Sequence, residues 1–303
     1  MSENFSDKLS QAVLQTIAYS DIFDYPLTAH EIHRYLTGVK ASYEQVLQVL
    51  EEEPVTRVGE YFTVPGREAI AGIRMRREAS SRKIMPRAVR YGRILAALPY
   101  IRMVTLTGSL AMSNMEEGQD IDYMIVTAPN HLWTCRALAL LVARFARFEN
   151  IQLCPNFLIT ENALTLTDRS LYAAHEMTQM ILISGPETYD RMRRLNAWTD
   201  EYLPNAQGAP KIFDMPKTPT QFQILFEFLS LLFPVRLIEQ WEMNRKIKKL
   251  SREQASSSES RFTRDVCKGH ADRHGEKTVR ALNERLQSFE PGLTALLRDV
   301  NVQ

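Results

Sequence analysis

The chain has few cysteines, almost no net charge and no long uninterrupted apolar run. Its three cysteines, spread over 303 residues, are too few and too scattered for a disulfide framework, which favours a reducing compartment. The formal net charge of +1 gives no global electrostatic reason to expect a nucleic-acid partner. These absences argue against a small secreted disulfide-rich domain and against a strongly basic nucleic-acid-binding protein.

A targeting or membrane-spanning segment is not indicated either. Glu3 and Asp7 interrupt the amino terminus, so no signal peptide is expected. The most apolar stretch, 222–238, contains Glu227 and Arg236 and therefore predicts a buried amphipathic helix rather than a membrane span. The basic residues that follow it leave an interfacial helix as the alternative. We therefore expect a cytoplasmic protein with no membrane span.

The sequence does contain a glycine-serine pair, Gly108-Ser109, followed after a short loop by Asp120 and Asp122. Side chains alternate faces along a strand, so these two carboxylates point the same way, about 6 to 7 Å apart. Carboxylates at such a spacing can share or bridge Mg²⁺ ions, which neutralise triphosphate charge. The pattern predicts a site that holds a nucleoside triphosphate through a divalent metal.

The segments around this motif support that interpretation. Residues 101–107 and 120–126 each predict a buried strand, one entering the glycine-serine turn and one leaving the loop. Gly108 permits close backbone approach, and Ser109 offers a hydroxyl and an amide to phosphate oxygens. A helix that starts after Ser109 would add its own amide groups.

Gly108, Ser109, Asp120 and Asp122, with this spacing and strand context, resemble the motif of the nucleotidyltransferase superfamily. That superfamily includes DNA polymerase beta, the aminoglycoside nucleotidyltransferases and the minimal nucleotidyltransferases of bacteria. The resemblance implies an α+β fold with a mixed sheet and a nucleoside triphosphate substrate. It also implies Mg²⁺ or Mn²⁺ bound by the two aspartates, and β- and γ-phosphates held at the glycine-serine pair.

The superfamily places a third carboxylate on the strand that follows the two aspartates. In this chain the corresponding strand is 151–159, which contains no acid, and Asn156 occupies the expected position. An amide oxygen can bind metal but carries no charge and cannot act as a base. Alternatively Glu149, Glu161 or Glu176 supplies the missing oxygen.

The chain divides into four predicted regions. These are a winged-helix-like module (1–65), a basic linker helix (66–98), a nucleotidyltransferase core (99–184) and a mainly helical carboxy-terminal region (185–303). Within the last two regions we expect helices over 131–148, 171–183, 187–203 and 220–250, and a final helix that contains Val279 to Phe289. The order of the regions resembles a group of uncharacterised bacterial predicted nucleotidyltransferases, which supplies no substrate.

The first region predicts three helices and a hairpin. Thr28 and Ser42 are the expected amino-terminal caps of the second and third helices, and the hairpin over 55–64 turns at Gly59. The third helix, which would enter the DNA groove in a winged helix-turn-helix, carries four glutamates. An acidic surface lacks the electrostatic attraction to phosphates that dominates the affinity of proteins for DNA. A role of this module in protein contact or packing is therefore favoured over DNA binding.

The linker region 66–98 carries nine basic residues. It is interpreted either as a solvated helix or as a source of cations near the triphosphate.

Two weaker patterns complete the candidate sites. Cys267, His270 and His274 have a spacing that could suit zinc, although no fourth ligand is evident. His175-Glu176 is either a surface or core pair or an acid-base dyad facing the cleft.

The sequence therefore predicts a metal-dependent nucleotidyltransferase that transfers a nucleoside monophosphate from a triphosphate to an acceptor hydroxyl, with release of pyrophosphate. The alternative is a nucleotide-binding or regulatory protein with weak catalysis, in which Asn156 replaces the third acid. The acceptor and the oligomeric state are not predicted.

Overall fold

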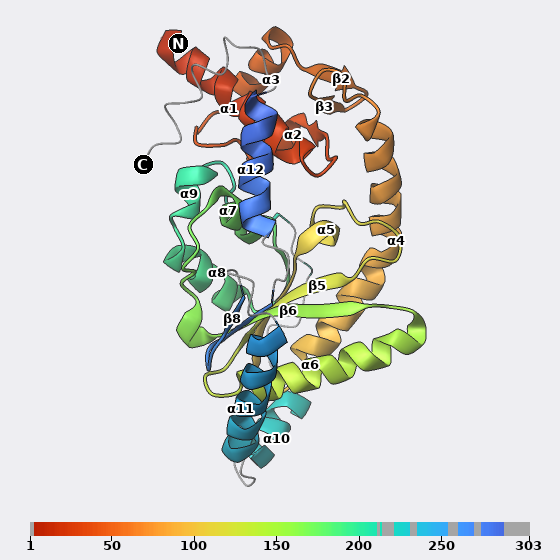
Figure 1. Cartoon of the computed structure of the whole chain (residues 1–303), viewed down its shortest axis with the longest axis vertical. Coiled ribbons are helices and arrows are strands. Elements are labelled where there is room, and N and C mark those ends of the chain that lie inside the picture. The colour runs from red at the N-terminus through yellow and green to blue at the C-terminus, as the bar shows by residue number, and fades with distance from the viewer. Residues whose placement is uncertain are drawn as a thin grey trace.

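The computed structural model describes residues 3–210, 213, 221–230, 235–253, 260–269 and 274–287. These residues form an α+β structure with one sheet of three strands and one of six strands (Figure 1). Within the described ranges, no helix has the length and apolar character needed to cross a membrane.

The amino-terminal part combines three helices with the small sheet. The elements are α1 (Glu3–Asp21), β1 (Leu27–Thr28), α2 (Ala29–Arg34), α3 (Tyr43–Glu52), β2 (Thr56–Val58) and β3 (Tyr61–Thr63), and the antiparallel sheet has the order β1-β3-β2. Both predicted caps are confirmed, since Thr28 and Ser42 each form a capping box. The hairpin predicted at Gly59 is present between β2 and β3.

The large sheet contains β4 (Ile101–Leu106), β5 (Ile121–Thr127), β6 (Leu153–Thr160), β7 (Ile181–Ser184), β8 (Arg261–Phe262) and β9 (Val266–Lys268). Its order is β7-β4-β5-β6-β9-β8, and only β5 and β6 are parallel. The strands β4, β5 and β6 confirm the three strands predicted from apolar runs. The sheet is therefore mixed, as expected.

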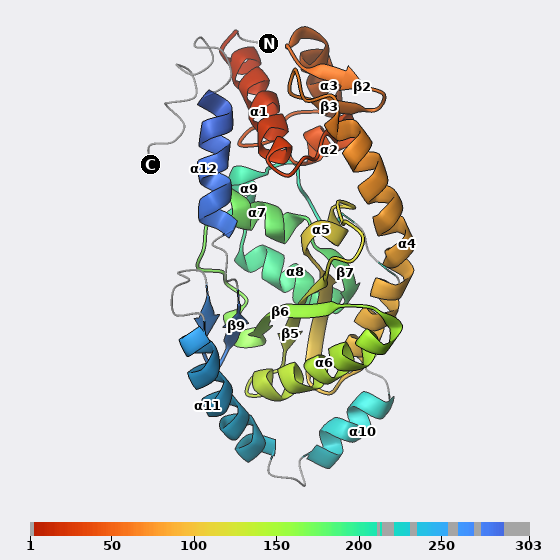
Figure 2. The ribbon, with the colours of Figure 1, turned by 45° about the vertical axis from the view of Figure 1, so that its right-hand side comes forward.

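Helices cover both faces of this sheet (Figure 2). On one face, α4 (Ile70–Ala96) and α6 (Leu132–Ala146) pack on a buried cluster that includes Ile121, Tyr123 and Ile125. On the other face, α7 (Leu171–Thr178) and α8 (Pro186–Leu195) pack on a cluster that includes Met124 and Val126. Because β5 alternates between the faces, Asp122 leaves the sheet on the α7 side.

One prediction about the large sheet was wrong. The helix predicted over 171–183 ends at Thr178, and Ile181–Ser184 forms β7, which pairs with β4. A short, fully buried apolar run has no period that separates strand from helix, so pairing decides its conformation. The carboxy-terminal region, predicted as mainly helical, also contributes the β8–β9 hairpin to the sheet edge. These strands are too short to show an alternating pattern.

The remaining elements are short or peripheral. They are α5 (Gly108–Ala111), the 3-10 turns η1 (Arg147–Glu149) and η2 (Glu161–Ala163), α9 (Thr199–Tyr202), α10 (Gln221–Ser230), α11 (Val235–Glu253) and α12 (His274–Gln287). The helix predicted over 187–203 is divided into α8 and α9. The range 220–250, predicted as one helix, contains α10 and α11, and 231–234 lie outside the described residues.

The carboxy-terminal helix α12 returns to the amino-terminal part of the chain (Figure 2). Leu282 and Leu286 pack with Ala18 and Tyr19 of α1 in one buried cluster. Arg285 also forms a 2.9 Å ion pair with Asp21, whose side chain is almost fully buried. These contacts close the α1 side of a large cavity above the sheet.

Candidate active site

The turn at Gly108 lies in direct contact with Asp122. The backbone N–H of Thr107 donates to the carbonyl oxygen of Asp122 at 3.1 Å, which joins the end of β4 to the start of β5. Gly108 has φ +64°, and a Cβ at this position would lie 2.5 Å from Oδ2 of Asp122. Only glycine allows this conformation and this approach without displacing the carboxylate.

Ser109 and Asp120 lie on either side of this contact. The hydroxyl of Ser109 donates to the side-chain oxygen of Gln119 at 3.1 Å, which ties the start of α5 to the end of the loop. Asp120 immediately precedes β5 and is exposed. Its charge still acts on Asp122, because it is one of the causes of the raised pKa of that carboxyl. The structure thus brings the four motif residues together where β4 ends and β5 begins.

Asn156 acts as a donor to Asp122. It lies on β6, and its amide nitrogen donates to Oδ1 of Asp122 at 2.8 Å. The amide therefore orients the carboxylate and does not present its oxygen to the same position. No acidic residue occurs on β6, as the sequence indicated.

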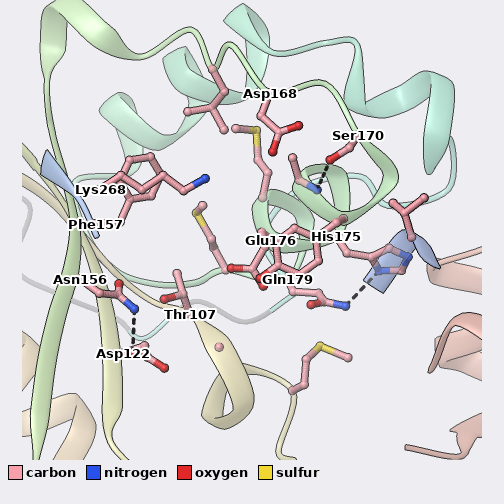
Figure 3. A pocket seen from close by; sticks show the side chains of 18 of the residues that line it. Thr107, Asp122, Asn156, Phe157, Asp168, Ser170, His175, Glu176, Gln179 and Lys268 are labelled. Atoms are coloured by element: carbon pink, nitrogen blue, oxygen red, sulfur yellow. Dashed lines mark hydrogen bonds between the residues drawn. The ribbon is translucent and has the colours of Figure 1, made fainter. Parts of the chain in front are cut away.

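Of the three glutamates considered for the missing carboxylate, Glu176 lies at the site. Glu149 forms a surface ion pair with Arg90. Glu161 is on η2 and does not line the cavity that contains Asp122, whereas Glu176 on α7 does. Figure 3 shows Glu176 entering the cavity from α7, on the side opposite Asp122 and Asn156.

The cavity above the sheet has a volume of about 1600 Å³. Gly108, Ser109, Asp122 and Asn156 line one end of it. The other walls come from α1, α7, α12 and the β8–β9 hairpin, with the side chains of Thr16, Tyr19, Phe23, Tyr172, His175, Arg261, Lys268, Arg280 and Glu284 among the lining groups. Elements from both ends of the chain therefore enclose the site.

Burial and negative charge dominate the electrostatics around Asp122. Burial, followed by the charges of Glu176 and Asp120, raises the pKa of Asp122 to about 7. Burial also raises the pKa of Glu176, an effect that the positive charge of Lys268 opposes. A partly desolvated group of three carboxyls would be stabilised by a bound cation.

The donor chemistry and charge fit a hard divalent cation such as Mg²⁺ or Mn²⁺, which prefers carboxylate oxygens. The glycine at position 108 keeps the space beside Oδ2 of Asp122 free of a side chain. Among the described residues, however, no group of three or more His, Cys, Asp or Glu side chains is already gathered closely enough to hold a metal. Asp122 is the central ligand candidate, Asp120 lies two residues before it, and Glu176 faces it from α7 across the cavity.

The structure describes Cys267 of the possible zinc pattern and His175 of the possible acid-base dyad. Cys267 is buried on β9, and burial raises the pKa of its thiol, whereas His270 of the zinc pattern lies outside the described residues. His175 is buried and stacks on Tyr19 with ring centroids 4.0 Å apart. Burial lowers the pKa of His175 to about 3, so the ring is neutral near pH 7 and cannot serve as a charged acid.

The basic helix α4 does not supply the cations of this cavity. None of the nine basic residues of the predicted linker 66–98, eight of which lie on α4, lines the cavity. Arg74 is 4% exposed and pairs with Glu78 of the same helix and with Glu31 of α2, and the second pair joins α4 to the amino-terminal part. The cations that do line the cavity are Arg261, Lys268 and Arg280. Sequence reasoning missed them because they depend on the unpredicted hairpin and on the return of α12.

No family model matches this chain, and no curated protein or solved structure is significantly similar to it.

Proposed function

We propose that the protein is a metal-dependent nucleotidyltransferase that moves a nucleoside monophosphate from a nucleoside triphosphate to an acceptor hydroxyl. The observation that carries the proposal is the contact between the Gly108 turn and the buried carboxylate of Asp122, at the wall of a cavity of about 1600 Å³. The mixed sheet, with β4 antiparallel and β6 parallel to β5, is consistent with the superfamily that the motif resembles.

In this proposal each motif residue has one role. Asp120 and Asp122 bind Mg²⁺ or Mn²⁺, and Asn156 holds the Asp122 carboxylate in place through its 2.8 Å hydrogen bond. Gly108 and Ser109 bind the β- and γ-phosphates through backbone and hydroxyl groups. The bound ion supplies neutralisation of triphosphate charge and activation of the attacking hydroxyl.

The transfer balances without a further reactant. The acceptor oxygen forms a bond to the α-phosphorus, while the bond from that phosphorus to the bridging oxygen breaks and pyrophosphate leaves with the electron pair. The hydroxyl proton passes to Glu176, whose pKa is raised by burial towards the range that suits a general base. Glu176 thus takes the place of the acid that β6 lacks.

The test is binding of each common nucleoside triphosphate in the presence of Mg²⁺, measured by calorimetry, followed by detection of released pyrophosphate. Asp122→Asn keeps the size of the side chain but removes its charge, and we expect it to abolish Mg²⁺-dependent binding. Asp190→Asn, on the exposed face of α8, is the matched control and should bind as the wild type does. Absence of binding to the wild type, or equal binding by Asp122→Asn, would refute the proposal.

A second function, nucleotide binding without efficient transfer, is favoured by one observation. Asn156 gives Asp122 a hydrogen bond where a third carboxylate is expected, so β6 contributes no charge to a second metal. Such a protein would bind the triphosphate with Mg²⁺ but release no pyrophosphate under any acceptor condition. The same calorimetry and pyrophosphate assay separate the two functions.

For the winged-helix-like module we propose packing rather than DNA reading. The turn between α2 and α3 is covered by the last residue of α9 and by residues just after it. Asn205 donates to the carbonyl oxygens of His33 and Ala41 at 2.9 and 3.0 Å, and the N–H of Gly38 donates to the carbonyl oxygen of Tyr202 at 2.7 Å. A helix-turn-helix whose turn is covered in this way, and whose third helix is acidic, is poorly placed to enter a DNA groove.

A further inference from the structure

Two cations lie directly opposite each other on the β8–β9 hairpin. Arg261 and Lys268 are register partners in this antiparallel pair, so both side chains leave the same face. Like charges in directly opposite positions destabilise a strand pair. Both residues line the large cavity, and a group that binds between them would therefore relieve their repulsion.

Neither cation is neutralised by a carboxylate within the described part of the chain, where no ion pair within 4.0 Å involves either of them. The ammonium of Lys268 lies 5.6 Å from the ring centroid of Phe157, and Arg261 donates to the hydroxyl of Thr167 at 3.5 Å. The carboxylate of Asp265, in the hairpin turn, instead accepts a 2.6 Å hydrogen bond from Thr160.

Other charged groups share this wall without neutralising the pair. Asp168 and Glu284 also line the cavity, as does the cation Arg280 of α12. The charge of Lys268 acts on Glu176 and opposes the rise in pKa that burial causes there, although the two form no direct ion pair. Figure 3 shows the Lys268 side chain extending into the cavity above Phe157.

The sheet register places these cations relative to Asp122. Lys268 pairs with Phe157 of β6, and Phe157 pairs with Met124 of β5, two residues after Asp122. At about 4.8 Å between strands, Lys268 lies about 10 Å across the sheet from β5. Phe157 and Met124 pack in the same cluster on the α7 side, the side on which Asp122 leaves β5.

The Gly108 turn lies on the opposite side of Asp122. It follows β4, the other neighbour of β5 in the order β7-β4-β5-β6-β9-β8. Asp122 therefore stands between the turn to which we assign the β- and γ-phosphates and the cation pair. The cavity of about 1600 Å³ also exceeds the roughly 300–1000 Å³ that one small ligand usually occupies.

We propose that Arg261 and Lys268 bind a phosphate group of the acceptor, so that the acceptor is a phosphorylated small molecule whose hydroxyl is presented to Asp122. A phosphomonoester carries a charge of about −1.5 to −2 near pH 7. This charge matches the two cations better than the single negative charge of a carboxylate ligand does. The guanidinium can bind two phosphate oxygens, and the ammonium adds a point charge. This assignment rests on the proposed function, which places the triphosphate at the Gly108 turn and therefore leaves the side of Lys268 for the acceptor.

The first experiment measures binding of methyl phosphate by calorimetry in EDTA, so that no metal-bound phosphate contributes. We expect Lys268→Met to weaken this binding about tenfold or more, since a charge-assisted contact is lost. Lys268→Arg should retain most of it. Lys248→Met, on the exposed face of α11, is the matched control and should bind as the wild type does. Equal binding of methyl phosphate by Lys268→Met and the wild type would overturn the proposal, as would acetate binding as tightly as methyl phosphate.

The second experiment measures the affinity of the same proteins for a non-hydrolysable nucleoside triphosphate with Mg²⁺. We expect Lys268→Met to bind it within about twofold of the wild type, because the cation pair lies on the acceptor side. A loss as large as that for methyl phosphate would assign the cations to the triphosphate and overturn the proposal. If the wild type binds methyl phosphate through Lys268 but binds no triphosphate, the nucleotidyltransferase function fails while the phosphate site stands.

Discussion

Replacement of Gly108 by alanine tests the close approach of backbone and carboxylate on which the candidate site depends. An L-residue at φ +64° costs about 1 kcal/mol relative to glycine. The new Cβ would also lie 2.5 Å from Oδ2 of Asp122, so the carboxylate must move. That movement breaks the hydrogen bond from Asn156, which is worth about 1 kcal/mol. We therefore expect Gly108→Ala to lose about 2–3 kcal/mol of stability.

Gly118→Ala is the matched control for this change. Gly118 also has a positive φ, +87°, but a Cβ there would meet no atom within 4 Å. Gly118→Ala therefore has the same conformational cost of about 1 kcal/mol for an L-residue at positive φ, but no collision with Asp122. The difference between the two variants therefore isolates the contact between the turn and the carboxylate.

The free energies of unfolding are measured by urea denaturation, and Mg²⁺-dependent triphosphate binding by calorimetry. We expect Gly108→Ala to be less stable than Gly118→Ala by about 1 kcal/mol or more and to lose nucleotide binding, which Gly118→Ala retains. Equal stability of the two variants would show that the Cβ is accommodated without cost. If Gly108→Ala then also bound nucleotide normally, the geometric argument for the site would be refuted.

Two further predictions concern stability alone. Arg74→Met leaves Glu31 without its buried partner and should lower the free energy of unfolding, measured by urea denaturation, by about 3–5 kcal/mol. Arg76→Met, on the exposed face of α4, should change it by less than about 0.5 kcal/mol. Equal effects of the two changes would contradict the assigned role of Arg74. The pKa of His175, about 3 in the folded state, lies below its usual value of about 6.5, so unfolding takes up a proton and stability falls as pH drops below about 6.5. From pH 6.5 to 5.5 the wild type should lose about 1 kcal/mol that His175→Phe does not lose, and parallel pH profiles of the two proteins would refute the burial argument.

Local sequence signals determined the parts of the fold that depend on near neighbours. Thr28 and Ser42 form the predicted capping boxes because a cap needs only residues three positions away. The strands β4 and β5 follow from apolar runs that end at Gly108 and begin beside Asp122. The sequence predicted that this turn and this carboxylate belong to one site, because a glycine and an acid at adjacent strand ends carry a local signal, whereas their direct contact is given by the structure.

Other features depend on partners far along the chain and left no local signal. The run Ile181–Ser184 becomes a strand because β4 offers it a partner, although its apolar residues suit a helix equally well. The hairpin that carries Arg261 and Lys268 exists because β9 pairs with β6, more than a hundred residues earlier. Glu176 belongs to the site only because α7 packs over the face on which Asp122 leaves β5.

The sequence by itself determined the motif, its two flanking strands and the absence of an acid on β6. Tertiary structure alone decided that Asn156 donates to Asp122, that Glu176 faces the same cavity, and that Arg74 of α4 pairs with Glu31 of α2 and does not line the cavity. The physical reason is distance along the chain. Period and capping act over a few residues, whereas charge pairing, strand pairing and burial depend on which segments the folded chain brings together.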